Sequence, residues 1–67
     1  MKDEDSIEKL GLTDRTMLAV RRLGVRTVGE LAAYSEFELL GIKGFGVYTV
    51  SNIVKRMEAN GRKLRRV

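Results

Sequence analysis

The chain has 67 residues, with thirteen lysines and arginines, nine acidic residues and a formal net charge of +4. This length accommodates one small domain, since domains typically run from about 50 to 250 residues. Apolar residues make up 43% and charged residues 33%, which argues against disorder. Cysteine and histidine are both absent, which excludes a disulfide framework and removes the usual zinc ligands and nucleophile–base pairs. We therefore expect no enzyme activity, no metal and no cofactor.

The sequence also predicts no membrane-spanning segment and no secretory signal. No apolar run approaches the length of about 18 residues that crosses a bilayer. The first five residues are mostly acidic or polar, unlike a secretory signal. We expect a cytoplasmic protein with no membrane partner, divided into a flexible acidic lead-in (1–6), a helical domain (7–64) and a basic tail end (65–67).

The first predicted helix covers about residues 14–23. Thr13 is a plausible N-cap, because its hydroxyl can accept a hydrogen bond from an unpaired amide of the first turn. Met17, Val20 and Leu23 then follow at helical spacing, until Gly24 ends the pattern. Val25, in the connection that follows, is expected to enter the core.

Two capping boxes come next. Thr27 with Glu30, and Ser35 with Glu38, each place a hydroxyl three residues before a carboxylate, so that the two side chains satisfy each other's backbone amides. Each box predicts a short helix, and these helices are expected to end near Ala33 and Gly41.

The longest predicted helix runs from about 47 to 59. Its apolar stripe follows the i, i+3, i+4, i+7 pattern, and Asn60-Gly61 closes it. Leu64 lies beyond and is expected to fold back as a last core contact. The stripe comprises Val50, Ile53, Val54 and Met57.

No segment combines β-branched residues with period-two alternation, so no strand is predicted. Five glycines stand at the edges of the helical segments, where a left-handed residue ends a helix. The fold class expected is all-α, a compact bundle of four to five short helices. The five glycines are Gly24, Gly41, Gly44, Gly46 and Gly61.

The segment Gly44-Phe45-Gly46 is the candidate binding site of the sequence. Glycines on both sides of one apolar residue let the backbone turn sharply while Phe45 enters the core. Gly46 then opens the last helix, whose first amides lack intrahelical partners and carry the positive end of the helix dipole. A phosphate can bind there, with Lys43 and the Thr49 hydroxyl near enough to assist.

Two short helices joined in this way resemble the helix-hairpin-helix motif, a DNA-binding element that grips backbone phosphates without sequence specificity. The flanking apolar residues Leu39, Leu40 and Ile42, and then Val50 and Ile53, stand at the spacings of that motif. The alternative is a tight helix connection that serves packing alone.

The resemblance extends along the sequence from about Ser6 to Leu64. The order of elements is similar to the C-terminal domain of the bacterial RNA polymerase alpha subunit, a compact helical domain. That family binds the minor groove of A·T-rich DNA upstream of promoters and offers a docking surface to transcription activators. The resembling segments are 7–16, 23–31, 35–40 and the glycine hairpin with its helix.

Three positions match the DNA-contacting residues of that family. Arg15 corresponds to the arginine that enters the minor groove. Gly46 corresponds to the hairpin glycine whose amide meets a phosphate, and Thr49 keeps a hydroxyl where the family has serine. The resemblance thus implies contacts to both the groove and the backbone.

Three other positions depart from the family. Leu18 replaces a DNA-contacting asparagine, Tyr48 replaces a phosphate-binding lysine, and Asn52 replaces an acidic residue. These departures favour a divergent or stand-alone relative, from a phage, a plasmid or a small host factor, in a bacterial or phage-infected cell.

The charge pattern predicts a basic side and an acidic side. Residues 15–26 carry four arginines and no acid, the segment 55–67 has a net charge of +5, and Glu30, Glu36 and Glu38 lie in a stretch without a base. A basic patch attracts phosphates, although it also serves solubility alone. The predicted DNA-binding residues are Arg15, Arg21, Arg22, Lys43, Gly44, Gly46, Tyr48 and Thr49.

Two functions remain open from the sequence. The first is a DNA-binding module that contacts the phosphate backbone and the minor groove of double-stranded DNA with weak sequence preference, in transcription. The second is a protein-interaction module that docks on RNA polymerase or a transcription factor and has lost DNA binding. Leu18, Tyr48 and the acidic side are the candidate contacts of the second.

Overall fold

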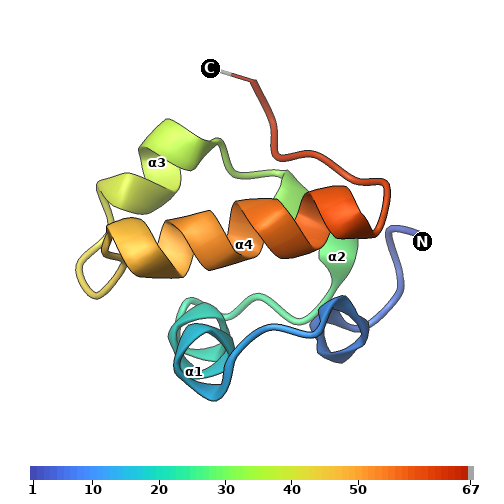
Figure 1. Cartoon of the computed structure of the whole chain (residues 1–67), viewed down its shortest axis with the longest axis horizontal. Helices are drawn as coiled ribbons and strands as arrows, with labels where there is room; N and C mark the ends of the chain where they lie inside the picture. Colours follow the sequence, from blue (N-terminus) through green and yellow to red (C-terminus); the bar gives the residue numbers. More distant parts are fainter. Residues whose placement is uncertain (67) are drawn as a thin grey trace.

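The computed structural model describes residues 1–66 and contains a 3-10 helix followed by four α-helices (Figure 1). No strand occurs among these residues, which hold two isolated bridges only. The predicted all-α bundle of short helices is therefore confirmed. The elements are η1 (Ile7–Leu10), α1 (Asp14–Arg22), α2 (Val28–Ala32), α3 (Glu36–Leu40) and α4 (Val47–Ala59).

Helix α4 lies across the middle of the molecule, with α1 on one side and α3 on the other (Figure 1). Its predicted stripe faces the core, since Val50, Ile53 and Met57 are buried. From α1, Val20 and Thr16 are buried and Met17 is half-buried, as is Leu23 directly after the helix. The helices pack around one hydrophobic cluster, which also receives Val25, Phe45 and Leu64 as predicted.

The predicted helix starts are confirmed. The Thr13 hydroxyl accepts a hydrogen bond from the Thr16 amide at 3.3 Å. Both capping boxes are closed, with the hydroxyls of Thr27 and Ser35 bound to backbone amides and the carboxylates of Glu30 and Glu38 bound in return. Short helices such as α2 and α3 need these bonds, because few of their own amides have intrahelical partners.

The 3-10 helix η1 was not predicted. The Ser6 hydroxyl caps it by accepting from the Glu8 amide, and Gly11 ends it in a left-handed conformation with φ of 77°. Ile7 and Leu10 face the core. A single turn with two apolar residues has too few repeats to show helical periodicity in the sequence.

The segment before η1 is bound to α2. The amides of Val28 and Gly29 donate to the carbonyls of Asp5 and Asp3, both at 2.8 Å. Arg62 pairs with the Asp3 carboxylate from the far end of the sequence. The prediction of a flexible lead-in did not anticipate these contacts between residues 1–6 and the rest of the fold. The division into lead-in, domain and tail stays a prediction.

The C-terminal segment returns to the body of the fold. The Arg65 amide donates to the carbonyls of Ala32 and Tyr34 at 3.0 Å, and its guanidinium reaches Ala33 and Glu38. Arg65, the first residue of the predicted basic tail end, thus belongs to the packed structure. Val67, the last, lies outside the described residues.

The expectation of left-handed glycines is wrong at two of five positions. Gly24, Gly44 and Gly61 have positive φ, but Gly41 and Gly46 have φ of −83° and −86°. Gly41 keeps a right-handed conformation because the backbone goes on turning there, with the Ile42 amide bonded to the Leu39 carbonyl. Gly46 is extended because it is the N-cap of the next helix.

Across residues 1–66, no helix is both long and apolar enough to traverse a lipid bilayer.

Candidate nucleic-acid interface

The turn between α3 and α4 exposes its backbone. Phe45 is buried in the core, as predicted, while the glycines on either side face outward. A Cβ placed on Gly44 or Gly46 would meet no atom within 4 Å. Another molecule can therefore approach the main chain at this corner closely.

The N-terminus of α4 has no side chain that neutralises it. Gly46 makes no side-chain cap, and the first turn of α4 contains no acidic residue. In contrast, α1, α2 and α3 each have a hydroxyl cap and an acid in the first turn. The free amides and the positive dipole end of α4 thus point to solvent uncompensated.

Helix α1 lies beside this corner and completes a shallow hollow of about 460 Å³. The α1 side of the hollow carries two arginines, and the other side is formed by the glycine turn and the start of α4. No acidic residue among those described lines it. Its lining residues are Arg15, Leu18, Ala19, Arg22, Gly44, Gly46, Tyr48 and Thr49.

Six of the eight predicted site residues therefore meet in one place. Lys43 lies next to them, in a smaller hollow of about 140 Å³ that shares Arg22 and Gly44 with the first. Thr49 lines the hollow although it is only 7% exposed.

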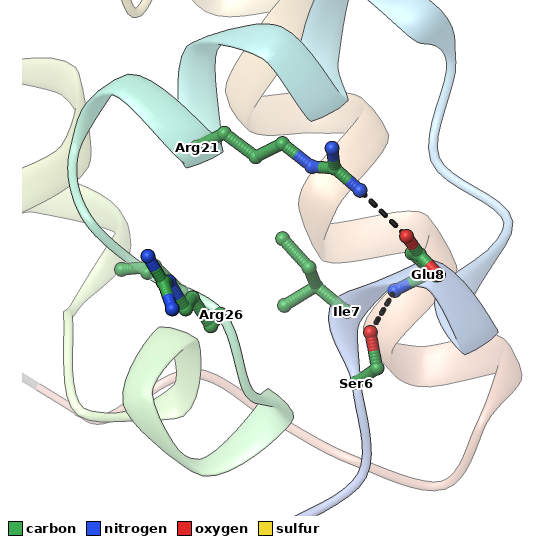
Figure 2. A pocket seen from close by; sticks show the side chains of 6 residues that line it. Ser6, Ile7, Glu8, Arg21 and Arg26 are labelled. Carbon is green, nitrogen blue, oxygen red and sulfur yellow. Dashed lines mark hydrogen bonds and ion pairs between the residues drawn. The ribbon is translucent and has the colours of Figure 1, made fainter.

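Arg21 is separated from the other predicted residues. Its guanidinium pairs with the Glu8 carboxylate at 2.6 Å and lines a different hollow, beside Ser6, Ile7 and Arg26 (Figure 2). Successive residues of an α-helix point about 100° apart, and this turns Arg21 toward η1 while Arg22 faces the hairpin. Contact of Arg21 with DNA stays a prediction, and this placement does not support it.

The three cations around the hairpin are not neutralised by the rest of the described structure. Within residues 1–66, Arg15, Arg22 and Lys43 form no ion pair. Two of the C-terminal arginines differ, because Arg62 and Arg65 are in ion pairs with Asp3 and Glu38. The positive charge around the hairpin is therefore available to a partner.

Two of the three acids of the predicted acidic side, Glu30 and Glu38, have internal partners. The Arg26 and Thr27 amides bind the Glu30 carboxylate, and these backbone hydrogen bonds lower the pKa of Glu30. The Ser35 amide, with help from Arg65, lowers the pKa of Glu38 in the same way. Capping thus accounts for both carboxylates without an external partner.

Sequence reasoning missed two residues of this region and left the role of a third unexplained. Ala19 lines the hollow, and Val47 is exposed at the open start of α4. No local pattern in the sequence marks either residue, because packing against neighbouring elements decides which face of a helix is exposed. Asn52 accepts a hydrogen bond from the Thr13 amide at 3.2 Å, which joins α4 to the start of α1.

No group of three or more metal-ligating side chains gathers anywhere in residues 1–66.

These features define a small helical domain in which a glycine hairpin and an arginine-bearing helix share one face. Residues 1–59 match the family model for the C-terminal domain of the alpha subunit of bacterial RNA polymerase. The protein belongs to this family, and the resemblance found in the sequence is confirmed.

Among curated proteins, the sequence is similar to the subunit named DNA-directed RNA polymerase subunit alpha from several bacteria. It is 36% identical over 59 residues to that of Bifidobacterium adolescentis and 41% identical to that of Rubrobacter xylanophilus. The subunit of Acidothermus cellulolyticus is 39% identical. Each match covers 88% of the present sequence but only 17–19% of the relative. The protein described thus spans less than a fifth of the length of these relatives.

Proposed function

We propose that this domain binds double-stranded DNA through the phosphate backbone and the minor groove, with weak sequence preference, and acts in transcription. It works as a binding domain and not as an enzyme, in the cytoplasm of a bacterial or phage-infected cell. RNA polymerase or a transcription factor is its second partner.

One observation carries this proposal: a single hollow combines two arginines that lack an ion pair within residues 1–66 with the uncapped N-terminus of α4. A phosphate at that N-terminus accepts hydrogen bonds from free amides and lies at the positive end of the dipole. Arg22 and Lys43 stand beside it for the neighbouring phosphates. Arg15, on the same side of α1, reaches the groove and the phosphates at its edge.

Family membership supports the same proposal. The relatives are named as subunits of a DNA-directed RNA polymerase. The matched region includes α1, the glycine turn and all of α4. The elements that form the hollow therefore all lie in the shared region.

A DNA titration tests the proposal. A fluorescent duplex is titrated with the protein at several salt concentrations, and three phosphate-neutralising cations predict a slope of log K against log salt of about −3. Arg15→Ala should weaken binding by about tenfold and reduce the slope by about 1. Arg21→Ala is the matched control, since it removes the same charge from the same helix but outside the hollow.

Circular dichroism establishes that both variants are folded. A dissociation constant weaker than about 1 mM at low salt contradicts the proposal, because non-specific DNA binding alone reaches about 1–100 µM. An Arg21→Ala variant that loses more affinity than Arg15→Ala contradicts the assignment of the site.

A second function is favoured by exposed apolar residues in the same hollow. Leu18 is 52% exposed and Tyr48 is 92% exposed, and both types of residue occur in protein interfaces. In this second function, the domain docks on a component of the transcription machinery through these two residues. A pull-down with nuclease-treated bait tests this, because partners that vanish with the nucleic acid count against direct protein contact.

A further inference from the structure

Leu18 lies between two cations on the surface of α1. It follows Arg15 by three residues and precedes Arg22 by four, so the three side chains share one face of the helix. Leu18 is half exposed, with 52% of its surface open to solvent. An apolar side chain thus projects from the centre of a basic strip.

The other side of the hollow is also apolar and exposed. Tyr48 is almost fully exposed at the first turn of α4, beside the outward-facing backbone of Gly46. The hollow therefore offers an aliphatic and an aromatic group, with positive charge around them and, among the described residues, no acid. That charge selects an anionic occupant, which favours nucleic acid over a basic protein surface.

An exposed apolar side chain between two cations is a feature of some proteins that bind the minor groove. Proteins that bind the minor groove often insert an apolar side chain between base steps, which unstacks the step and kinks the duplex, while flanking cations hold the phosphates. We infer that Leu18 is a wedge that opens a base step in the minor groove, with Arg15 and Arg22 on the flanking backbone and Tyr48 on the facing rim. This inference rests on the proposed function and adds a mode of binding to it.

The wedge implies a preference for flexible DNA. A pyrimidine–purine step such as TA unstacks readily, whereas an A-tract is stiff and has a narrow minor groove. The domain should therefore discriminate between duplexes of identical base composition by deformability alone. Electrostatic binding without insertion has no reason to favour the TA step.

Two duplexes provide the test. One contains the block TTTTAAAA, which has a central TA step, and the other contains AAAATTTT, which has none. Affinities are measured by fluorescence anisotropy at several salt concentrations. In a second pair, 2-aminopurine replaces the adenine at the centre of each block, and its emission rises when the base is unstacked.

The variants are Leu18→Asn and Phe37→Ala. Leu18→Asn replaces the wedge by a polar side chain of similar size on an exposed position. Phe37→Ala is the control, because Phe37 is an exposed apolar residue on α3 and lies outside the hollow. Circular dichroism shows whether each variant is folded.

We expect the wild-type protein to bind the TA-step duplex at least about threefold more tightly and to raise its 2-aminopurine emission. Leu18→Asn should lose both effects while its salt slope stays near that of the wild type, and Phe37→Ala should keep both. Equal affinities without a change in emission, at a salt slope of about −3, overturn the wedge and leave DNA binding intact. A preference that survives in Leu18→Asn also overturns it, and a protein that binds neither duplex overturns the proposed function as well.

Discussion

Arg56 and Leu10 are joined by a hydrogen bond between positions 46 residues apart, in which the Arg56 Nε donates to the Leu10 carbonyl at 2.7 Å. This bond fastens the second half of α4 to the end of η1. The left-handed Gly11 adjoins it so closely that a Cβ there would lie 2.9 Å from an Nη of Arg56. Arg56, which the charge pattern assigned to a basic surface, therefore stabilises the fold.

Arg56→Ala should destabilise the domain by about 1–3 kcal/mol, because the Leu10 carbonyl loses a charged hydrogen-bond donor. Asn60 also reaches that carbonyl, at 3.4 Å, and compensates in part. The matched control is Lys55→Ala on the same helix, where Lys55 is exposed and a change within about 0.5 kcal/mol is expected. Urea unfolding monitored by circular dichroism gives both free energies. Equal stability of the two variants contradicts this role of Arg56.

Gly46→Ala separates binding from folding. Its φ of −86° suits any residue and no atom lies within 4 Å of the new Cβ, so we expect a loss of stability below about 1 kcal/mol. The methyl group shields the first amides of α4, and DNA affinity should fall about threefold to tenfold. Anisotropy titration and urea unfolding measure the two effects.

Gly44→Ala is the comparison variant at the same corner. Gly44 has φ of 95°, so alanine strains the backbone there and should cost about 1–2 kcal/mol of stability. The prediction fails if Gly46→Ala is the more destabilising of the two, or if it binds DNA as tightly as the wild type.

The capping boxes should make the stability depend on pH. Backbone amides of Arg26 and Thr27 hold the pKa of Glu30 below its ordinary value of 4.5, and the Ser35 amide, with help from Arg65, does the same for Glu38. A pKa that is lower in the folded than in the unfolded state stabilises the fold above the unfolded value, and this contribution disappears as the pH falls through the folded value. The urea midpoint should therefore fall progressively below about pH 4.5.

Glu30→Gln identifies the source of this dependence. Glutamine keeps an oxygen that accepts from the two amides but does not titrate, so the slope of the midpoint between about pH 5 and pH 3 should become shallower. Glu36→Gln is the control, because Glu36 takes no part in either capping box. Identical slopes in Glu30→Gln and the wild type would falsify the assignment.

Gly29→Ala should detach the N-terminal segment from α2. The new Cβ would lie 2.7 Å from the Asp3 Cβ and 3.1 Å from its carbonyl oxygen, which the Gly29 amide binds. We expect faster hydrogen exchange at residue 29 with the core amides unchanged, because only a local contact opens. Gly41→Ala is the control, since its Cβ finds ordinary contacts at 3.5 Å. If hydrogen exchange at position 29 stays slow in the Gly29→Ala variant, the N-terminal segment has shifted to accommodate the methyl group and remains bound to α2, which contradicts the prediction.

Most of the fold could be predicted because its signals are local. Thr13, the two capping boxes and the stripe of α4 each depend on residues within a few positions of one another, and all are confirmed. The 3-10 helix and the binding of residues 1–6 to α2 depend on contacts between distant segments. No spacing within a single segment encodes such contacts.

Only the part of the candidate site that depends on a local sequence pattern could be predicted. The glycine hairpin is a local pattern, but the partner of each arginine is set by which element lies opposite. Arg21 and Arg22 are neighbours in sequence, yet η1 supplies Glu8 to the first and the hairpin faces the second. The sequence also showed a cluster of C-terminal arginines without showing that Arg56, Arg62 and Arg65 bind the body of the domain.

DNA binding at the hollow is tested most directly by a nitrogen–proton NMR titration of the labelled protein with an A·T-rich duplex. We expect shifts that saturate with DNA and concentrate on the amides around the hollow, at Arg15, Leu18, Arg22, Gly44, Gly46 and Tyr48. Residues of η1 and of α3, which lie outside the hollow, should change little. Shifts confined to η1 or α3, or no shifts at millimolar protein and low salt, would contradict DNA binding at the hollow.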